Sequence, residues 1–271
     1  MRMYENKYSI YITCDSISKE EQEQFDTDRI DVVTTSPEAK KRVICISDSK
    51  QVLNEMMDKQ IPVIAYVPND EVSGELMSAR YAIDCLNAID YNYIDLVYHR
   101  TYMLPMMIAQ TERLIIRELS EKDANQVKQI FEDKSIARIA TGLYNEEEEL
   151  KHSLRRYYRE NYQFFEYGYW GIFHRQNDEM IGLAGFSNSS GNECLELGYA
   201  IRTDYRHKGY AQEAVLSILS YITRKKMGNT IEAVVEKGNV SSIKLLKAVG
   251  FTRVKEEMIE DMTSLRYEYC R

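Results

Sequence analysis

The sequence is poor in the features that mark metal sites, disulfides and membrane spans. Its five cysteines and four histidines are scattered, with no CxxC or Cys/His spacing. This excludes a recognisable zinc motif and favours reduced thiols, so we predict no metal site. No apolar run reaches the ~18 residues of a membrane span, and the first residues lead into no apolar signal core. We therefore expect a cytoplasmic protein without a membrane partner.

A surplus of basic charge is also missing. The net charge is −8: residues 1–109 carry 11 basic and 18 acidic side chains, whereas residues 110–271 carry 24 and 25. An acidic chain without a basic stripe is a poor partner for nucleic acid. The change in charge balance and the length of 271 residues predict two domains, 1–109 and 110–271.

The first domain is predicted to be a small parallel α/β domain of unknown role. Apolar runs at 8–16, 42–49 and 61–67 read as strands, with a helix at 50–59 capped by Asp48 or Ser49. Asp15 and Asp48 at strand ends suggest either a phosphatase or nucleotide site or simple helix caps. The domain only vaguely resembles a haloacid-dehalogenase-like half domain, because Asp15 is not followed by the second Asp of that family's nucleophile loop.

The second domain begins a new series of strands and helices. Leu114 and Ile116 alternate on one face of a first strand, and Ser120 with Asp123 forms a capping-box-like helix start. The strands and helices expected after it are a hairpin over 168–187, a strand over 194–201, a helix over 211–226 stopped by Gly228, a strand over 230–235, a helix over 240–248, and a closing antiparallel pair over 251–254 and 262–270.

The most informative stretch is Arg206-His207-Lys208-Gly209-Tyr210-Ala211, which joins an apolar strand to a helix. The first backbone N–H groups of a helix have no partner inside it, and the helix dipole adds positive potential there. Gly209 would let the backbone come close to a ligand. The stretch therefore predicts an anion site of the kind that holds a pyrophosphate.

Three motifs together resemble the GNAT (Gcn5-related N-acetyltransferase) superfamily, in its RimJ/RimL-like branch. They are the opening TERLIIREL at 111–119, Arg206-x-x-Gly209-x-Ala211, and Asn239-x-x-Ser242 followed by Gly250-Phe251. The resemblance covers about residues 111–256. It implies a mostly antiparallel mixed sheet flanked by helices, with two parallel strands, 195–201 and 231–236, that splay apart.

The resemblance also implies acetyl-CoA as co-substrate. The residues expected to hold it are Gly198, Tyr199, Ala200, Ile201, Arg206, His207, Lys208, Gly209, Tyr210, Ala211 and Asn239. The splay would leave backbone groups of the first strand for the pantetheine arm, since buried backbone groups gain free energy when they are paired.

For catalysis, Glu196 is the candidate base that takes a proton from the acceptor amine. The alternative is a solvent-facing strand residue, because Glu196 alternates with Leu195 and Leu197. Many GNAT enzymes have a Tyr where this chain has Leu246, so Ser242 is the candidate proton donor to the thiolate. A purely local bond at the helix start is the alternative for Ser242.

The acceptor is expected to be a primary amine of a small molecule or a peptide. Phe186, Tyr167 and Arg159 are candidates for its binding, with core packing or a solvated helix face as the alternatives. A homodimer stays open. The main alternative function is a non-catalytic acyl-CoA-binding sensor or regulatory module, favoured by Leu246 and by the uncertain base.

Overall fold

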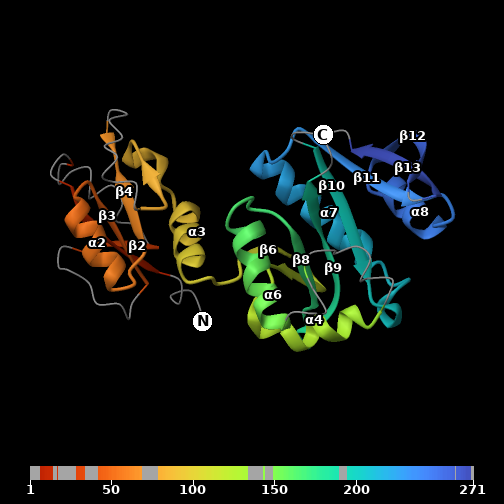
Figure 1. Cartoon of the computed structure of the whole chain (residues 1–271), viewed down its shortest axis with the longest axis horizontal. Coiled ribbons are helices and arrows are strands. Elements are labelled where there is room, and N and C mark those ends of the chain that lie inside the picture. The colour runs from red at the N-terminus through yellow and green to blue at the C-terminus, as the bar shows by residue number, and fades with distance from the viewer. Residues whose placement is uncertain are drawn as a thin grey trace. The chain divides into compact units, whose positions relative to one another are not determined.

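The chain divides into two compact units, Met1–Leu104 and Pro105–Arg271 (Figure 1). The boundary expected at residue 109 falls inside the first strand of the second unit, β6 (Met107–Gln110). The computed structural model describes residues 7–14, 17, 29–33, 42–68, 79–133, 143, 149–188, 194–259 and 261–269.

The first unit is built on a parallel sheet with the order β2-β1-β3-β4-β5. This is the flavodoxin-like doubly wound order. The five residues of β3 are all buried, which explains their continuous apolar run. The strands are β1 (Tyr8–Thr13), β2 (Ile30–Val33), β3 (Val43–Ser47), β4 (Val63–Tyr66) and β5 (Ala82–Ile83).

Two helices of this unit follow from local signals. Helix α2 (Lys50–Asp58) begins at Ser49, whose hydroxyl accepts a hydrogen bond from the Val52 N–H. The last described part of the unit begins at residue 79 and holds β5, a 3₁₀ turn at Leu86–Ala88 and then α3 (Tyr91–Thr101). Asp15 lies outside the described residues, so the phosphatase interpretation stays a prediction.

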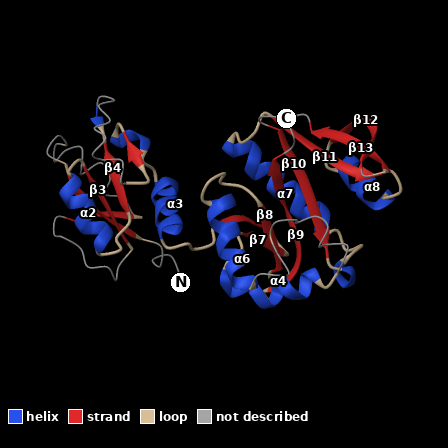
Figure 2. Ribbon diagram, viewed as in Figure 1, coloured by secondary structure: helices blue, strands red, loops and turns tan. Residues whose placement is uncertain are grey.

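The second unit is organised by a mixed sheet with the order β12-β13-β11-β10-β9-β8-β7-β6 (Figure 2). Every neighbouring pair is antiparallel except β10 and β11. This confirms the predicted fold class. Besides β6, the strands are β7 (Leu114–Arg117), β8 (Tyr169–His174), β9 (Glu179–Asn188), β10 (Cys194–Ile201), β11 (Thr230–Glu236), β12 (Phe251–Ile259) and β13 (Met262–Tyr269).

Helices cover both faces of this sheet. The backbone N–H of Tyr169 on β8 donates a hydrogen bond to the Tyr157 hydroxyl of α6 (2.7 Å). The ring of Trp170, the next residue of β8, packs edge-on against Tyr221 of α7. The helices are α4 (Ala124–Phe131), α6 (Leu150–Tyr157) with a π-helical continuation at Tyr158–Tyr162, α7 (Tyr210–Lys225) and α8 (Val240–Ala248).

Of two helix ends predicted for this unit, at Ser120 and at Gly228, one has the expected capping residue and the other does not. The capping box of Ser120 and Asp123 is confirmed. The end of α7 is not the glycine expected: Lys226 takes the left-handed conformation (φ 53°), two residues before Gly228. Among the described residues no helix is both long and apolar enough to cross a membrane.

Candidate active site

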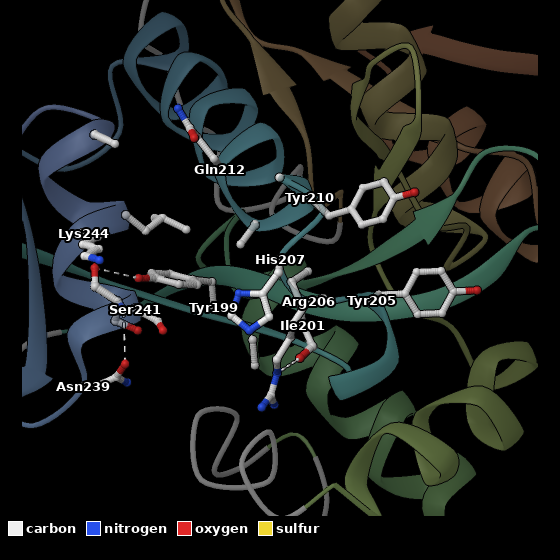
Figure 3. Close-up of a pocket in the computed structure, with 16 residues that line it drawn as sticks. Tyr199, Ile201, Tyr205, Arg206, His207, Tyr210, Gln212, Asn239, Ser241 and Lys244 are labelled. Atoms are coloured by element: carbon white, nitrogen blue, oxygen red, sulfur yellow. Dashed lines mark hydrogen bonds between the residues drawn. The ribbon is translucent and has the colours of Figure 1, made fainter.

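A pocket of about 570 Å³ opens where β10, the start of α7 and α8 meet (Figure 3). It brings together most of the residues predicted to bind a cofactor. The pocket is lined by Tyr199, Ala200, Ile201, Tyr205, Arg206, His207, Gly209, Tyr210, Ala211, Gln212, Asn239, Ser241, Ser242, Lys244, Leu245 and Ala248.

The sheet opens beside this pocket. The parallel strands β10 and β11 pair only at their first three positions, ending with Glu196 opposite Glu232. Each strand then continues, β10 along β9 and β11 along β13. The Arg202 N–H donates to Ile181 of β9 (2.8 Å). Because alternate strand residues bond the same neighbour, the backbone N–H and C=O groups of Leu197 and Tyr199 are directed into the opening.

The turn before α7 has the geometry of an anion site. Gly209 has φ 83°, which a residue with a Cβ adopts only at a cost. The first intrahelical bond runs from the Glu213 N–H to the Gly209 carbonyl (3.1 Å). The N–H groups of Tyr210, Ala211 and Gln212 therefore precede the hydrogen-bonded part of the helix and can bind an anion.

An ion pair from far along the chain holds this turn. Arg113 donates through Nε to Glu213 (2.7 Å) and through Nη1 to the Lys208 carbonyl (2.9 Å), and Thr111 donates to the other Glu213 oxygen (2.5 Å). Although burial opposes it, these hydrogen bonds keep the pKa of Glu213 below its usual value. The Glu213 charge is thus balanced at the helix start, where it would otherwise compete with a bound anion.

The basic side chains of the turn and His207 differ in their access to the pocket. Arg206 lines it, but its guanidinium donates to the Ile201 carbonyl (2.8 Å) and pairs with Asp133 (3.3 Å). His207 also lines it and points toward Tyr199 in Figure 3. Lys208 does not line it: its ammonium donates to the Asp204 carbonyl (3.0 Å). Gly198, the other predicted residue outside the pocket lining, lies further back on β10.

Helix α8 forms the far wall. Asn239 caps it by accepting a hydrogen bond from the Ser242 N–H (3.1 Å), and the Tyr199 hydroxyl donates to the Ser242 carbonyl (3.4 Å). Leu246 is buried. Lys244 also lines the pocket and was missed by sequence reasoning, although its spacing of three from Ser241 places both on one helix face.

Glu196 lies on the face of the sheet opposite to the one that carries Leu197 and Tyr199. It alternates with Leu197 and Tyr199 along β10 and stands across from Ser187 of β9 and Glu232 of β11. Burial, followed by the nearby Glu232 charge, raises the pKa of Glu196. Glu196 is the last residue of β10 that pairs with β11 before the strands part, and it does not line the pocket.

The structure separates the three predicted acceptor residues. Phe186 is buried and packs edge-on against Trp170, on the α7 face of the sheet. Tyr167 donates to the Asn188 side chain at the end of β9 (3.1 Å). Arg159 lines a shallow surface groove with His152, Arg155, Arg156 and Glu160. Tyr167 therefore lies near the β9 end that pairs with the start of β10, and so does Phe186, which stands opposite Leu197, whereas Arg159 lines the separate groove.

The fold and the site define a class of acyltransferase domain: a mixed sheet, two parallel strands that part, and a glycine turn that begins a helix beside the gap. The sequence of residues 113–252 matches the family model of the acetyltransferase (GNAT) domain. The chain belongs to the GNAT family, and its second unit is a GNAT-type N-acetyltransferase, as the sequence motifs predicted.

Relatives of the second unit agree with this assignment. Two uncharacterized N-acetyltransferases of Bacillus subtilis are similar: YoaA is 31% identical over 148 residues, 54% of this chain and 83% of its own, and YnaD is 29% identical over 144 residues, 53% and 81%. The fold is also that of a Salmonella typhimurium acetyltransferase described as modifying the N-terminal serine of ribosomal protein L7/L12 (TM-score 0.51, 15% identity, 61% of this chain, 99% of the other).

Proposed function

We propose that the second unit binds acetyl-CoA in the pocket of β10, α7 and α8 and transfers the acetyl group directly to a primary amine. The observation that carries the proposal is the parting of β10 and β11 after Glu196 and Glu232, directly beside the pocket. An opening through the sheet lets a donor on one face meet an acceptor on the other.

The residues of the site fit the chemical parts of such a donor. The N–H groups at the start of α7 would hold the pyrophosphate, with Lys244 as a nearby cation and His207 as a nearby polar side chain. The backbone groups of Leu197 and Tyr199 would pair with the amide-like pantetheine arm. A backbone N–H directed into the opening would stabilise the oxyanion formed when the thioester carbonyl is attacked.

Glu196 would act as the base on the acceptor face. Its raised pKa suits removal of a proton from an ammonium near neutral pH. An α-amino group, with a reference pKa of about 8, needs less help from a base than a lysine at about 10.4. The acceptor would accordingly be the amine of a peptide N-terminus or of a small molecule, and the L7/L12-modifying relative in fold is in keeping with the former.

Two hydroxyl groups can supply the proton for the departing thiolate. Ser242, the candidate donor from the sequence, lines the pocket at the start of α8. The Tyr199 phenol also lies there, and burial raises its pKa, so it stays protonated at neutral pH. Leu246 offers no proton, so Tyr199 would supply the phenol that other members carry on the helix.

The test combines CoA binding with an amine screen. Wild type and Glu196→Gln are incubated with acetyl-CoA and a panel of peptides, amino acids and polyamines while release of the CoA thiol is followed. We expect Glu196→Gln to lower kcat about 100-fold and to leave the CoA Kd within about twofold. CoA binding without acetylation of any amine would instead support the sensor or regulatory module.

A further inference from the structure

The face of the sheet that carries Glu196, on which the acceptor amine would bind, also carries a network of charged side chains that has no role in the reaction proposed above. Glu232 of β11 has 6% of its surface exposed and forms an ion pair with Arg266 of β13. Arg266 also donates through Nε to Glu257 of β12 (2.6 Å). The Arg266 guanidinium thus links the buried Glu232 carboxylate of β11 to Glu257 of β12 across β13.

The strand register places this network beside the proposed base. Glu196 and Glu232 are direct partners in the parallel pair, so their side chains point to the same face from strands about 4.8 Å apart. Glu232 is in turn the partner of Glu268, with Arg266 two residues earlier on the same face of β13. Glu196 is therefore the neighbour of a carboxylate whose own charge is already balanced.

The two carboxylates differ in their partners. Arg266 is committed to Glu232 and Glu257 through a fork of N–H donors. Neighbouring like charges cannot both ionise freely, so Glu196, for which the described residues show no ion pair, takes the proton more readily than Glu232. Among the described residues, the groups that act on Glu196 are Glu232 of β11, Arg266 of β13, Glu257 of β12 and Tyr169 of β8, while Cys194 of β10 and Glu268 of β13 interact with Glu232 and with each other.

We propose that Glu232, held in place by Arg266, is a positioning residue for the acceptor chemistry, because its balanced charge makes Glu196 the proton-accepting member of the pair. In the step itself, the N–H bond of the bound ammonium breaks. The electron pair stays on the nitrogen, and the proton goes to a carboxylate oxygen of Glu196. The role in catalysis rests on the proposed function, but the proton affinity of Glu196 does not.

The network also includes the Cys194 thiol. Burial raises the pKa of Cys194, and so does Glu232, which accepts a hydrogen bond from the thiol. The thiol is thereby kept in its protonated form, which is a poor nucleophile. This favours direct transfer to the amine over a covalent acetyl-cysteine intermediate.

The experiment titrates the Glu carboxyl groups by ¹³C NMR in the full chain, without acceptor. Glu196 is assigned by the signal lost in Glu196→Gln. We expect Glu232→Gln to weaken proton binding at Glu196 about tenfold, and Arg266→Gln to strengthen it. The matched control is Glu256→Gln, which removes the next carboxylate of β12, paired with Lys237 and Arg253, and leaves Glu196 unchanged.

If Glu232→Gln binds CoA and has the circular dichroism spectrum of wild type, an unchanged titration midpoint of Glu196 in that variant would overturn the proposal. If Glu232→Gln does not fold, Glu257→Gln substitutes for it. Glu257→Gln leaves Arg266 with one carboxylate fewer, so it should also weaken proton binding at Glu196. An unchanged Glu196 titration midpoint in Glu257→Gln would likewise overturn the proposal. Because no acceptor is present, the outcome is independent of whether acetyl transfer is found.

Discussion

Arg113 and Glu213 are 100 residues apart in sequence and form an ion pair that joins the start of β7 to the first turn of α7. The same guanidinium holds the Lys208 carbonyl and lies over the ring of Tyr210 (4.6 Å). The conformation of the proposed pyrophosphate turn thus depends on a residue outside the turn.

Arg113→Ala should therefore weaken CoA binding although Arg113 does not line the pocket. The loss of a partly exposed, forked ion pair is worth about 1–2 kcal/mol, which corresponds to a rise of about fivefold to thirtyfold in CoA Kd if the turn must be reordered on binding. Isothermal titration calorimetry measures it. Arg113→Lys keeps the positive charge but loses the forked N–H donors of the guanidinium, so its CoA Kd should lie between those of wild type and Arg113→Ala. Equal affinity in all three proteins would show that the turn holds its shape alone.

Gly209 gives a sharper test of the same turn. Among the described residues, a Cβ added at Gly209 would meet only Arg113, at 3.4 Å, so space is not the main obstacle. The left-handed φ costs a residue with a Cβ about 1–2 kcal/mol. We expect Gly209→Ala to weaken CoA binding about tenfold and Gly209→Val to abolish it. Gly238→Ala is the control, since an added Cβ there meets nothing within 4 Å. Retained affinity in Gly209→Val would contradict the anion site.

Lys244 allows the cation contribution of α8 to be isolated. It lines the pocket, whereas Lys247, one turn later on the same short helix, does not. Lys244→Ala should raise the CoA Kd about fivefold to tenfold, as expected for one charge-assisted contact to phosphate. The loss should shrink at high salt because the contact is exposed. Lys247→Ala should bind as wild type. Similar losses in both variants would point to a general effect of charge.

The features predicted correctly from sequence are those with short-range signals. The alternation of Leu114 and Ile116, the Ser120–Asp123 box and the Asn239 cap each lie within a few residues, so their physics can be read locally. The splay of β10 and β11 was expected from the family resemblance and not from the residues.

What could not be predicted depends on residues that are distant in sequence. Nothing near Arg113 indicates that it pairs with Glu213, and the row of Glu196, Glu232 and Arg266 exists only once three strands are in register. The left-handed Lys226 shows the limit of a local rule, because Gly228 was the better candidate by composition. Strand β6 was missed because its four residues include the exposed Met107.

The partly buried position of Glu196 predicts a cost in stability that is separate from catalysis. Since burial raises the pKa of Glu196, the folded state holds the proton more tightly than the unfolded state does. The stabilisation is complete below the ordinary value near 4.5 and is lost as the pH rises through the raised pKa. Glu196→Gln, which stays neutral, should therefore have a Tm about 2–4 °C above wild type at pH 8, roughly 1 kcal/mol, and no advantage near pH 4.

Glu256 provides the opposite sign on the same sheet. The hydrogen bond from Lys237 holds the pKa of Glu256 below its usual value, so its contribution is present above the ordinary pKa and is lost as the pH falls. Glu256→Gln should slightly lower the Tm at pH 8 and converge with wild type in acid. Thermal unfolding at both pH values, followed by circular dichroism, checks the pair. A Glu196→Gln variant less stable than wild type at pH 8 would mean that its carboxylate is stabilised in the fold, and it could not then be a base of high proton affinity.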